Sequence, residues 1–211
     1  SGRPVFYSTK RLSISGQNRN DWQLKPLAAV EDEFTIIAIG DPQCEVEKEA
    51  NRFRDETLVD IRSTISSAQT NSNRYHNAYA ITLGDVTFDN NALWPTMAKL
   101  CSSIELNNGK SIPVFNCIGN HDHNAEVQND DEAVGLFVEH FGPTDYSFNR
   151  GQVHFVVMDN IQCTSVDGFG DSKTWNYDGG YTSKQIAWLE KDLDAVDDKA
   201  NKMVILSGHI P

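Results

Sequence analysis

The sequence predicts an α/β fold in which helices are layered on a mainly parallel β-sheet. Apolar runs typical of buried strands recur along the chain, and segments with apolar residues at helical spacing separate them. The composition agrees, because 39% hydrophobic and 23% charged residues are ordinary for a globular protein. A chain of 211 residues is long enough to bury one good-sized core.

The predicted strands are short and strongly apolar. The first is apolar almost without interruption, as expected of a strand that is buried on both faces. Two later runs flank Asn149-Arg150-Gly151 and predict a hairpin. In chain order, the expected strands are residues 34–39, 78–83, 113–118, 146–148, 153–158 and 203–206.

Helices are expected between these strands, where apolar residues recur every three or four positions. Leu58, Ile61 and Ile65 show this spacing in the first helical segment. Thr182 and Gln185 form a predicted capping box at the start of the last one. The expected helices are residues 46–70, 93–104, 133–141 and 182–196.

Residues 1–33 differ from the rest of the chain because they are mostly polar. They include one short apolar group, Val5-Phe6-Tyr7, and an isolated Trp22. We interpret this segment as a linker or the remnant of a preceding domain. Residues 34–211 are then the main domain, and they show no internal repeat or low-complexity tract.

Charge and composition argue against several classes of function. The formal net charge of −12 would repel nucleic-acid phosphates, so general nucleic-acid binding is not expected. No stretch approaches the roughly 20 apolar residues that a membrane-spanning helix needs. None of the four cysteines belongs to a Cys-x-x-Cys pair, and a chain of this length needs no disulfide framework.

The most informative feature is a pattern shared by the ends of four strands. Each apolar run stops at a glycine, and a residue type that binds metals comes directly after it. Glycine there lets the backbone turn sharply and lets another group approach closely. The four segments are Gly40-Asp41-Pro42-Gln43, Gly84-Asp85, Gly119-Asn120-His121-Asp122 and Gly208-His209.

If these strands are parallel neighbours, their ends converge on one crevice at the carboxyl edge of the sheet. Carboxylate, amide and imidazole groups in one crevice suit divalent Mn, Fe, Zn or Mg. A central carboxylate can bridge two ions, which at about 3.5–4 Å apart can clamp a phosphate and generate hydroxide. The crevice would contain Asp41, Gln43, Asp85, Asn120, His121 and His209.

Taken singly, each segment has a simpler explanation. A Gly-Asp pair after a strand is a common turn, and a lone His209 needs no function. The combination is harder to explain in this way. An ordered Gly-Asn-His-Asp arises by chance in a chain of this length on the order of once in a thousand, and here it is the third of four such strand ends.

From Phe34 to Pro211 the sequence resembles the calcineurin-like metallophosphoesterases. That family carries, in order, Asp-x-His, Gly-Asp-x-x-Asp, Gly-Asn-His-Asp/Glu, a single histidine after a strand, and Gly-His-x-His. The strand ends above stand at the first three motifs, and Ser207-Gly208-His209-Ile210-Pro211 resembles the fourth. The resemblance implies a layered β-sandwich flanked by helices, and a hydrolase that cleaves a phosphomonoester or phosphodiester.

The resemblance also implies a dinuclear metal centre. Asp41 and Gln43 would bind the first divalent ion, and Asn120 and His209 would bind the second. Asp85 would bridge the two ions, and a hydroxide between them would attack phosphorus in line. The ions would be Mn, Fe, Zn or Mg, and the partner would be a phosphate-ester substrate.

Two further residues have catalytic roles by this resemblance. His121 would face the substrate without binding metal, stabilise the transition state and protonate the leaving oxygen. Asp122 would orient His121, as carboxylates orient imidazoles in other sites.

The sequence departs from the family pattern in three places. Gln43 stands where the family has histidine, as in members with Asp-Pro-Gln, and an amide oxygen is the weaker ligand. Asp89 lies one residue beyond the usual spacing of the second motif. Gly-His-x-His does not occur up to Pro211, so we expect a catalytic domain that is incomplete at its C-terminus.

These departures leave a second hypothesis open, a non-catalytic phosphate-binding or scaffold module that keeps the fold. His121 beside Asp122 favours the enzyme. Without the last motif, we expect the 211-residue fragment to bind metal weakly, to be inactive and to self-associate. By analogy with exported members that carry flanking domains, an extracytoplasmic location is favoured.

Overall fold

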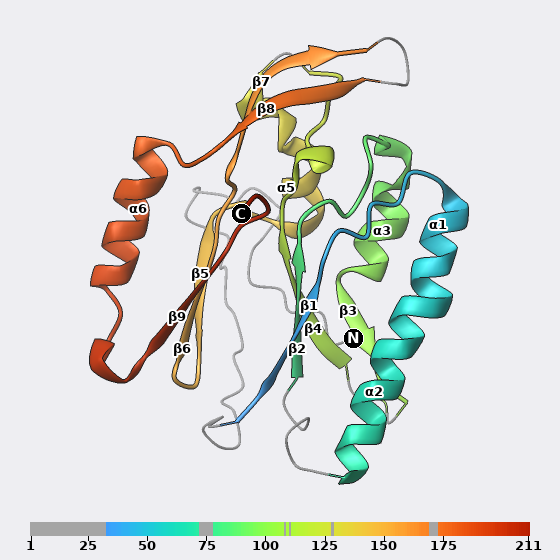
Figure 1. Ribbon diagram of the computed structural model, residues 1–211, viewed down its shortest axis with the longest axis vertical. Coiled ribbons are helices and arrows are strands. Elements are labelled where there is room, and N and C mark those ends of the chain that lie inside the picture. Colours follow the sequence, from blue (N-terminus) through green and yellow to red (C-terminus); the bar gives the residue numbers. More distant parts are fainter. Residues whose placement is uncertain (1–32, 72–77, 108, 110, 128, 169–172) are drawn as a thin grey trace, which may run out of the picture.

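The computed structural model describes residues 33–71, 78–107, 109, 111–127, 129–168 and 173–211 (Figure 1). The predicted linker or domain remnant lies outside these residues except for Glu33. In the described part, two β-sheets face each other and helices cover their outer sides (Figure 1). The expected mixed α/β fold with sheets flanked by helices is confirmed.

The first sheet has the strand order β1-β2-β4-β3. Its three parallel strands, β1, β2 and β4, are the apolar runs that the sequence predicted. The short β3 pairs antiparallel with β4 at the sheet edge. The bounds are β1 Thr35–Ile39, β2 Ala78–Leu83, β3 Ser103–Glu105 and β4 Ser111–Cys117.

The second sheet has the order β5-β6-β9. β5 and β6 form the predicted hairpin around Gly151, and β9 runs parallel to β6. The strand before His209 therefore belongs to a different sheet from those before Asp41, Asp85 and Asn120, which the pattern of apolar runs did not reveal. The bounds are β5 Tyr146–Arg150, β6 Val153–Val157 and β9 Met203–Ser207.

The two sheets are joined by an apolar layer between β2 and β4 on one side and β5 and β6 on the other. Phe115 of β4 stacks on Phe148 of β5 with ring centroids 4.0 Å apart. Tyr146 donates a hydrogen bond from its hydroxyl to the Asn116 carbonyl at 2.9 Å. Contacts of this kind contribute apolar burial and fix the relative position of the sheets.

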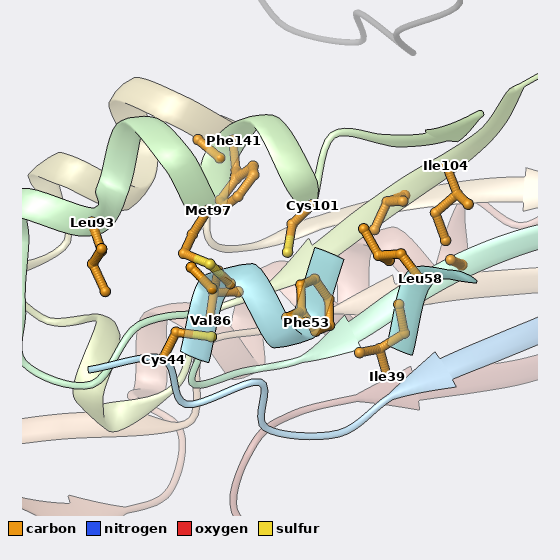
Figure 2. Close-up of a cluster of buried hydrophobic side chains, with 14 of the residues drawn as sticks. Ile39, Cys44, Phe53, Leu58, Val86, Leu93, Met97, Cys101, Ile104 and Phe141 are labelled. Carbon is orange, nitrogen blue, oxygen red and sulfur yellow. The ribbon is translucent and has the colours of Figure 1, made fainter. Parts of the chain in front are cut away.

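The main hydrophobic core lies between the first sheet and the helices on its outer side (Figure 2). Trp94 is buried and meets Phe137 and Phe141 edge-on. A π-helical turn, Phe53–Thr57, joins α1 to α2, so the predicted segment 46–70 is helical from Glu47 onward, with Val46 as its extended N-cap. The bounds are α1 Glu47–Arg52, α2 Leu58–Asn71, α3 Trp94–Leu100, α4 Asp130–Ala133 and α5 Gly135–Phe141.

The helix expected over residues 93–104 is shorter than predicted. A 3₁₀ turn, Asn91–Leu93, leads into α3, which ends at Leu100. Ile104 instead lies in β3 opposite Ile112 and is fully buried. Ile104 continued the apolar residues that recur every three or four positions in the predicted helix. A buried residue at the start of an edge strand can fall at the same spacing, so this pattern was misleading.

The outer side of the second sheet is covered by α6, Ser183–Asp194. The helix begins at the predicted capping box, with Gln185 N donating to Thr182 Oγ1 at 3.3 Å. Its Asp192 accepts hydrogen bonds from Ser147 Oγ at 2.6 Å and His154 Nε2 at 2.8 Å. A 3₁₀ turn, Lys199–Asn201, follows before β9.

A two-stranded hairpin, β7 Ile161–Asp167 and β8 Thr174–Gly179, extends beyond both sheets (Figure 1). These two strands were not expected from the sequence. Trp175 of β8 is buried and donates from Nε1 to the Asn124 carbonyl at 3.0 Å, which fixes the hairpin over the loop after Asp122. None of the helices that the structure describes combines the length and apolar character needed to cross a membrane.

Candidate metal centre

The carboxyl ends of β1, β2, β4 and β9 meet at one place, and His209 lies at its centre. Its Nε2 is 3.0 Å from Asn120 Oδ1 and 3.4 Å from Asp85 Oδ1. Its Nδ1 is 2.8 Å from the Leu83 carbonyl and 3.5 Å from Asp41 Oδ1. The structure thus brings together Asp41, Asp85, Asn120 and His209 from two sheets.

Asp85 is the most buried carboxylate of this group, with 1% of its surface exposed. Oδ1 accepts a hydrogen bond from the His121 backbone N–H at 3.0 Å, and Oδ2 accepts one from Gln43 Nε2 at 2.9 Å. Burial alone would raise the pKa of Asp85, but the hydrogen bonds from His209, Gln43 and His121 lower it. The carboxylate is therefore kept ionised.

Gln43 joins the group with its amide nitrogen turned inward. Besides the bond from Nε2, its backbone N–H donates to the Asp85 carbonyl at 2.7 Å. Only the amide oxygen can bind a cation, so Gln43 would present it after a half-turn of the amide. Gln43 thus lies beside Asp85 as expected, but its amide nitrogen, and not its amide oxygen, faces that carboxylate.

The backbone at the site is held in an uncommon conformation. Among the described residues, five other than glycine have positive φ, and four of them surround this centre. They are Asp41 at 39°, Gln43 at 43°, Asp85 at 49° and Asp89 at 51°. Side chains rarely adopt this left-handed region, and such strain concentrates at functional sites.

Two of the glycines predicted from the strand ends allow the loops to touch. A Cβ at Gly119 would collide with the backbone nitrogen and Oδ1 of Asp85. A Cβ at Gly84 would lie 2.8 Å from Cγ of His209 and 2.9 Å from the Gly119 Cα. Glycine is required here by close approach, which is the reason the sequence pattern suggested.

Asn160 positions the loop that carries His209. Its Oδ1 accepts hydrogen bonds from the backbone N–H groups of His209 at 3.0 Å and Ile210 at 3.1 Å. Its Nδ2 donates to the Ile210 carbonyl at 2.6 Å. No sequence motif marks this role of Asn160, because the contact joins residues almost 50 positions apart.

Asp122 does not orient His121, contrary to the sequence-based expectation. Its Oδ2 accepts from the backbone N–H groups of Val86 and Gly119, and its Oδ1 accepts from that of Thr87. Burial raises the pKa of Asp122 to about 6, although these hydrogen bonds oppose the shift. Asp122 therefore ties the loop after β2 to the loop after β4.

The carboxylate beside His121 is that of Asp89. Asp89 Oδ2 lies 2.9 Å from His121 Nδ1, and the imidazole stacks on Phe88 with ring centroids 3.9 Å apart. Burial alone would lower the pKa of His121, but the hydrogen bond and charge of Asp89 raise it. The unusual spacing of Asp89 from Asp85 hid this pairing in the sequence.

A cleft of about 720 Å³ opens beside the His121–Asp89 pair. Phe88 and Asp89 contribute to its wall, so the ring that stacks on His121 also borders the cleft. This volume is within the range of small-molecule sites. Its other charged lining residues are Glu45, Glu126 and Lys173.

The donor groups at the centre fit a divalent cation. Asp41, Asp85 and His209 each offer a ligand atom, and these atoms lie within 4.8 Å of one another. Ligand atoms bound at about 2.0–2.2 Å from one ion lie about 3–3.5 Å from one another. The distances from His209 Nε2 to Asn120 Oδ1 and Asp85 Oδ1, 3.0 and 3.4 Å, are in this range. Hydrogen bonding to Asp85 raises the pKa of His209 to about 9.

A model of the calcineurin-like phosphoesterase family matches residues 34–211, which include both sheets and every residue of this centre. No curated protein matches the chain. The matched segment covers well over half of the 211 residues. The chain belongs to the calcineurin-like phosphoesterase family.

Proposed function

We propose that this protein is a metal-dependent phosphoesterase that hydrolyses a phosphomonoester or phosphodiester at the centre described above. The observation that carries the proposal is the convergence of Asp41, Asp85, Asn120 and His209 beside a His121–Asp89 pair. Membership of the calcineurin-like phosphoesterase family supports it.

Two divalent ions would be held on either side of Asp85. Its oxygens face different neighbours, since Oδ2 meets Gln43 and Oδ1 lies 3.4 Å from His209. Asp41, Gln43 and Asp85 would bind one ion, and Asp85, Asn120 and His209 the other. When bound, such ions polarise a phosphoryl oxygen and activate water.

His121 would act on the leaving group. Its Nδ1 is engaged by Asp89 and its ring is held by Phe88, which leaves Nε2 as the group that can donate to a substrate. The raised pKa of His121 keeps the imidazole protonated at higher pH than usual. A protonated imidazole can transfer a proton to a leaving oxygen and stabilise the negative charge that develops there.

The test is made in the full-length protein, because the 211-residue fragment itself is expected to be inactive. It combines metal analysis with hydrolysis of p-nitrophenyl phosphate and bis(p-nitrophenyl) phosphate in the presence of Mn²⁺, Zn²⁺ or Mg²⁺. Asp85→Asn should lose metal and activity together, because both ions depend on this carboxylate. His121→Ala should keep the metal and lower turnover by about 100-fold or more. Metal binding without hydrolysis of either ester would instead favour the non-catalytic module.

A further inference from the structure

A second group of metal-binding side chains lies under the β7–β8 hairpin. It consists of His123, Asp130 and Cys163, each of which offers a ligand atom within 4.8 Å of the others. They come from three segments, since His123 follows the Asn120–Asp122 turn, Asp130 begins α4 and Cys163 lies in β7. The group shares no residue with the centre around Asp85.

His123 is the strongest sign that the group is a binding site. It is 2% exposed, and its Nδ1 bonds the Gly119 carbonyl at 2.9 Å, which fixes the direction of the ring. Its other nitrogen, Nε2, is buried without a hydrogen-bond partner. Asp159 Oδ2 lies 3.5 Å from this nitrogen, beyond ordinary hydrogen-bond distance. A buried polar atom without a partner is costly and calls for a ligand.

The other two members are held in place by their own contacts. Asp130 Oδ1 accepts a hydrogen bond from the Cys163 backbone N–H at 3.0 Å, so α4 and β7 are joined at this point. The Cys163 side chain is half-buried, and burial followed by the nearby Asp130 carboxylate raises the pKa of its thiol.

Imidazole nitrogen, thiolate and carboxylate form a ligand set that favours Zn²⁺. Tetrahedral Zn²⁺ with bonds of about 2.0–2.3 Å separates its ligands by about 3.3–3.8 Å. The present spread of ligand atoms, within 4.8 Å, needs only a small inward movement. Asp159 Oδ2 lies 3.5 Å from His123 Nε2 but outside the group of atoms within 4.8 Å of one another, so it would have to move inward to become a fourth ligand.

We propose that His123, Asp130 and Cys163 form a structural zinc site, separate from the centre around Asp85, that fastens the β7–β8 hairpin and α4 to the loop carrying Asn120 and His121. The hairpin is already held to this loop by the Trp175–Asn124 hydrogen bond. An ion at His123 fixes the same loop from its buried side, because His123 directly follows the Asn120–Asp122 turn.

Cobalt substitution tests the proposal, because a cysteine thiolate bound to Co²⁺ gives a charge-transfer band in the near ultraviolet. The full 211-residue chain, freed of metal by chelation, is titrated with Co²⁺ alone. We expect a thiolate band with one equivalent of Co²⁺, and Zn²⁺ should remove it. Cys163→Ser should abolish the band, and His123→Gln should weaken Co²⁺ affinity by about 10–100-fold or more.

Cys44→Ser is the matched control, because Cys44 is a buried thiol next to Gln43 of the other centre. This variant should keep the band, as should Asp85→Asn, which separates the proposal from the proposed phosphoesterase function. Circular dichroism and thermal unfolding establish that each variant is folded. Co²⁺ binding without a thiolate band, or a band that survives Cys163→Ser, would overturn the proposal.

Discussion

At His121 the direction of the imidazole is set by two neighbouring side chains. Asp89 contacts Nδ1 at 2.9 Å, and Phe88 stacks on the ring face. Asp122, which follows His121 in the sequence, instead accepts backbone hydrogen bonds from two loops. The two carboxylates therefore make different contacts, since Asp89 pairs with the His121 imidazole and Asp122 joins the two loops.

Asp89→Asn should change the pH dependence of phosphate-ester hydrolysis. His121 donates a proton only while protonated, so activity falls as the pH rises through its pKa. Removing the Asp89 charge lowers that pKa, and the alkaline limb of the kcat/KM profile should move to lower pH. The profile is measured with p-nitrophenyl phosphate at saturating metal.

Glu126→Gln serves as the control for this prediction. Glu126 lines the same cleft but is exposed, and its loss removes one negative charge from the cleft without touching the Asp89–His121 hydrogen bond. Its alkaline limb should stay at the wild-type position, because exposed charges are strongly screened. An unchanged limb in Asp89→Asn would show that Asp89 does not set the charge of His121.

Among the elements, the loops after β2 and β4 depend most closely on each other. The Gly119 Cα lies against the Asp85 carboxylate, and Asp122 bonds Val86 and Thr87 from the opposite loop. These contacts join the loop that carries Asp85 to the loop that carries Asn120. The absence of a side chain at Gly119 is required by this close approach.

Gly119→Ala should reduce both metal binding and stability. The added Cβ meets the backbone and carboxylate of Asp85, and overpacking of this kind costs about 1–3 kcal/mol in the free energy of unfolding. Gly135→Ala is the matched control, because nothing lies within 4 Å of a Cβ there. It should be neutral or stabilise by up to about 1 kcal/mol. Urea unfolding and Mn²⁺ content after dialysis measure both effects, and equal results for the two variants would contradict the prediction.

The sequence predicted most elements of the two sheets because their strands are short apolar runs with clear ends. It missed β7 and β8, whose residues are largely polar or exposed except for a few such as Trp175 and Ile161. This hairpin is held by one buried tryptophan and its contact to Asn124. Its sequence therefore lacks the regular alternation of apolar and polar residues that identifies a strand.

For the metal centre, sequence reasoning placed Asp41, Asp85, Asn120 and His209 together because each directly follows a strand. It could not show which groups Asp89 and Asn160 contact, because those contacts join distant segments. Nor could it show that Gln43 turns its nitrogen inward, since an amide orientation depends on its neighbours. Strand ends are local features, whereas these pairings depend on how the two sheets pack.

Over the whole molecule, the centre lies where the two sheets meet. Asp41, Asp85 and Asn120 follow strands of the first sheet, and His209 follows β9 of the second. An ion bound by residues from both sheets links them directly. Because such an ion binds only the folded arrangement, its binding free energy adds to the free energy of unfolding.

Mn²⁺ should therefore raise the unfolding temperature of the metal-free protein. At a free concentration of about 100 times Kd, binding adds about 2.7 kcal/mol, which for a chain of this size corresponds to about 5–10 °C. The measurement is best made in Cys163→Ser, so that the proposed zinc site does not contribute.

In that background Asp85→Asn should lose most of the shift, because both ions need this carboxylate. His209→Ala should lose part of it, because Asp41, Gln43 and Asp85 remain for one ion. Equal protection by Mn²⁺ with and without the Asp85 carboxylate would show that the metal binds elsewhere and does not join the two sheets.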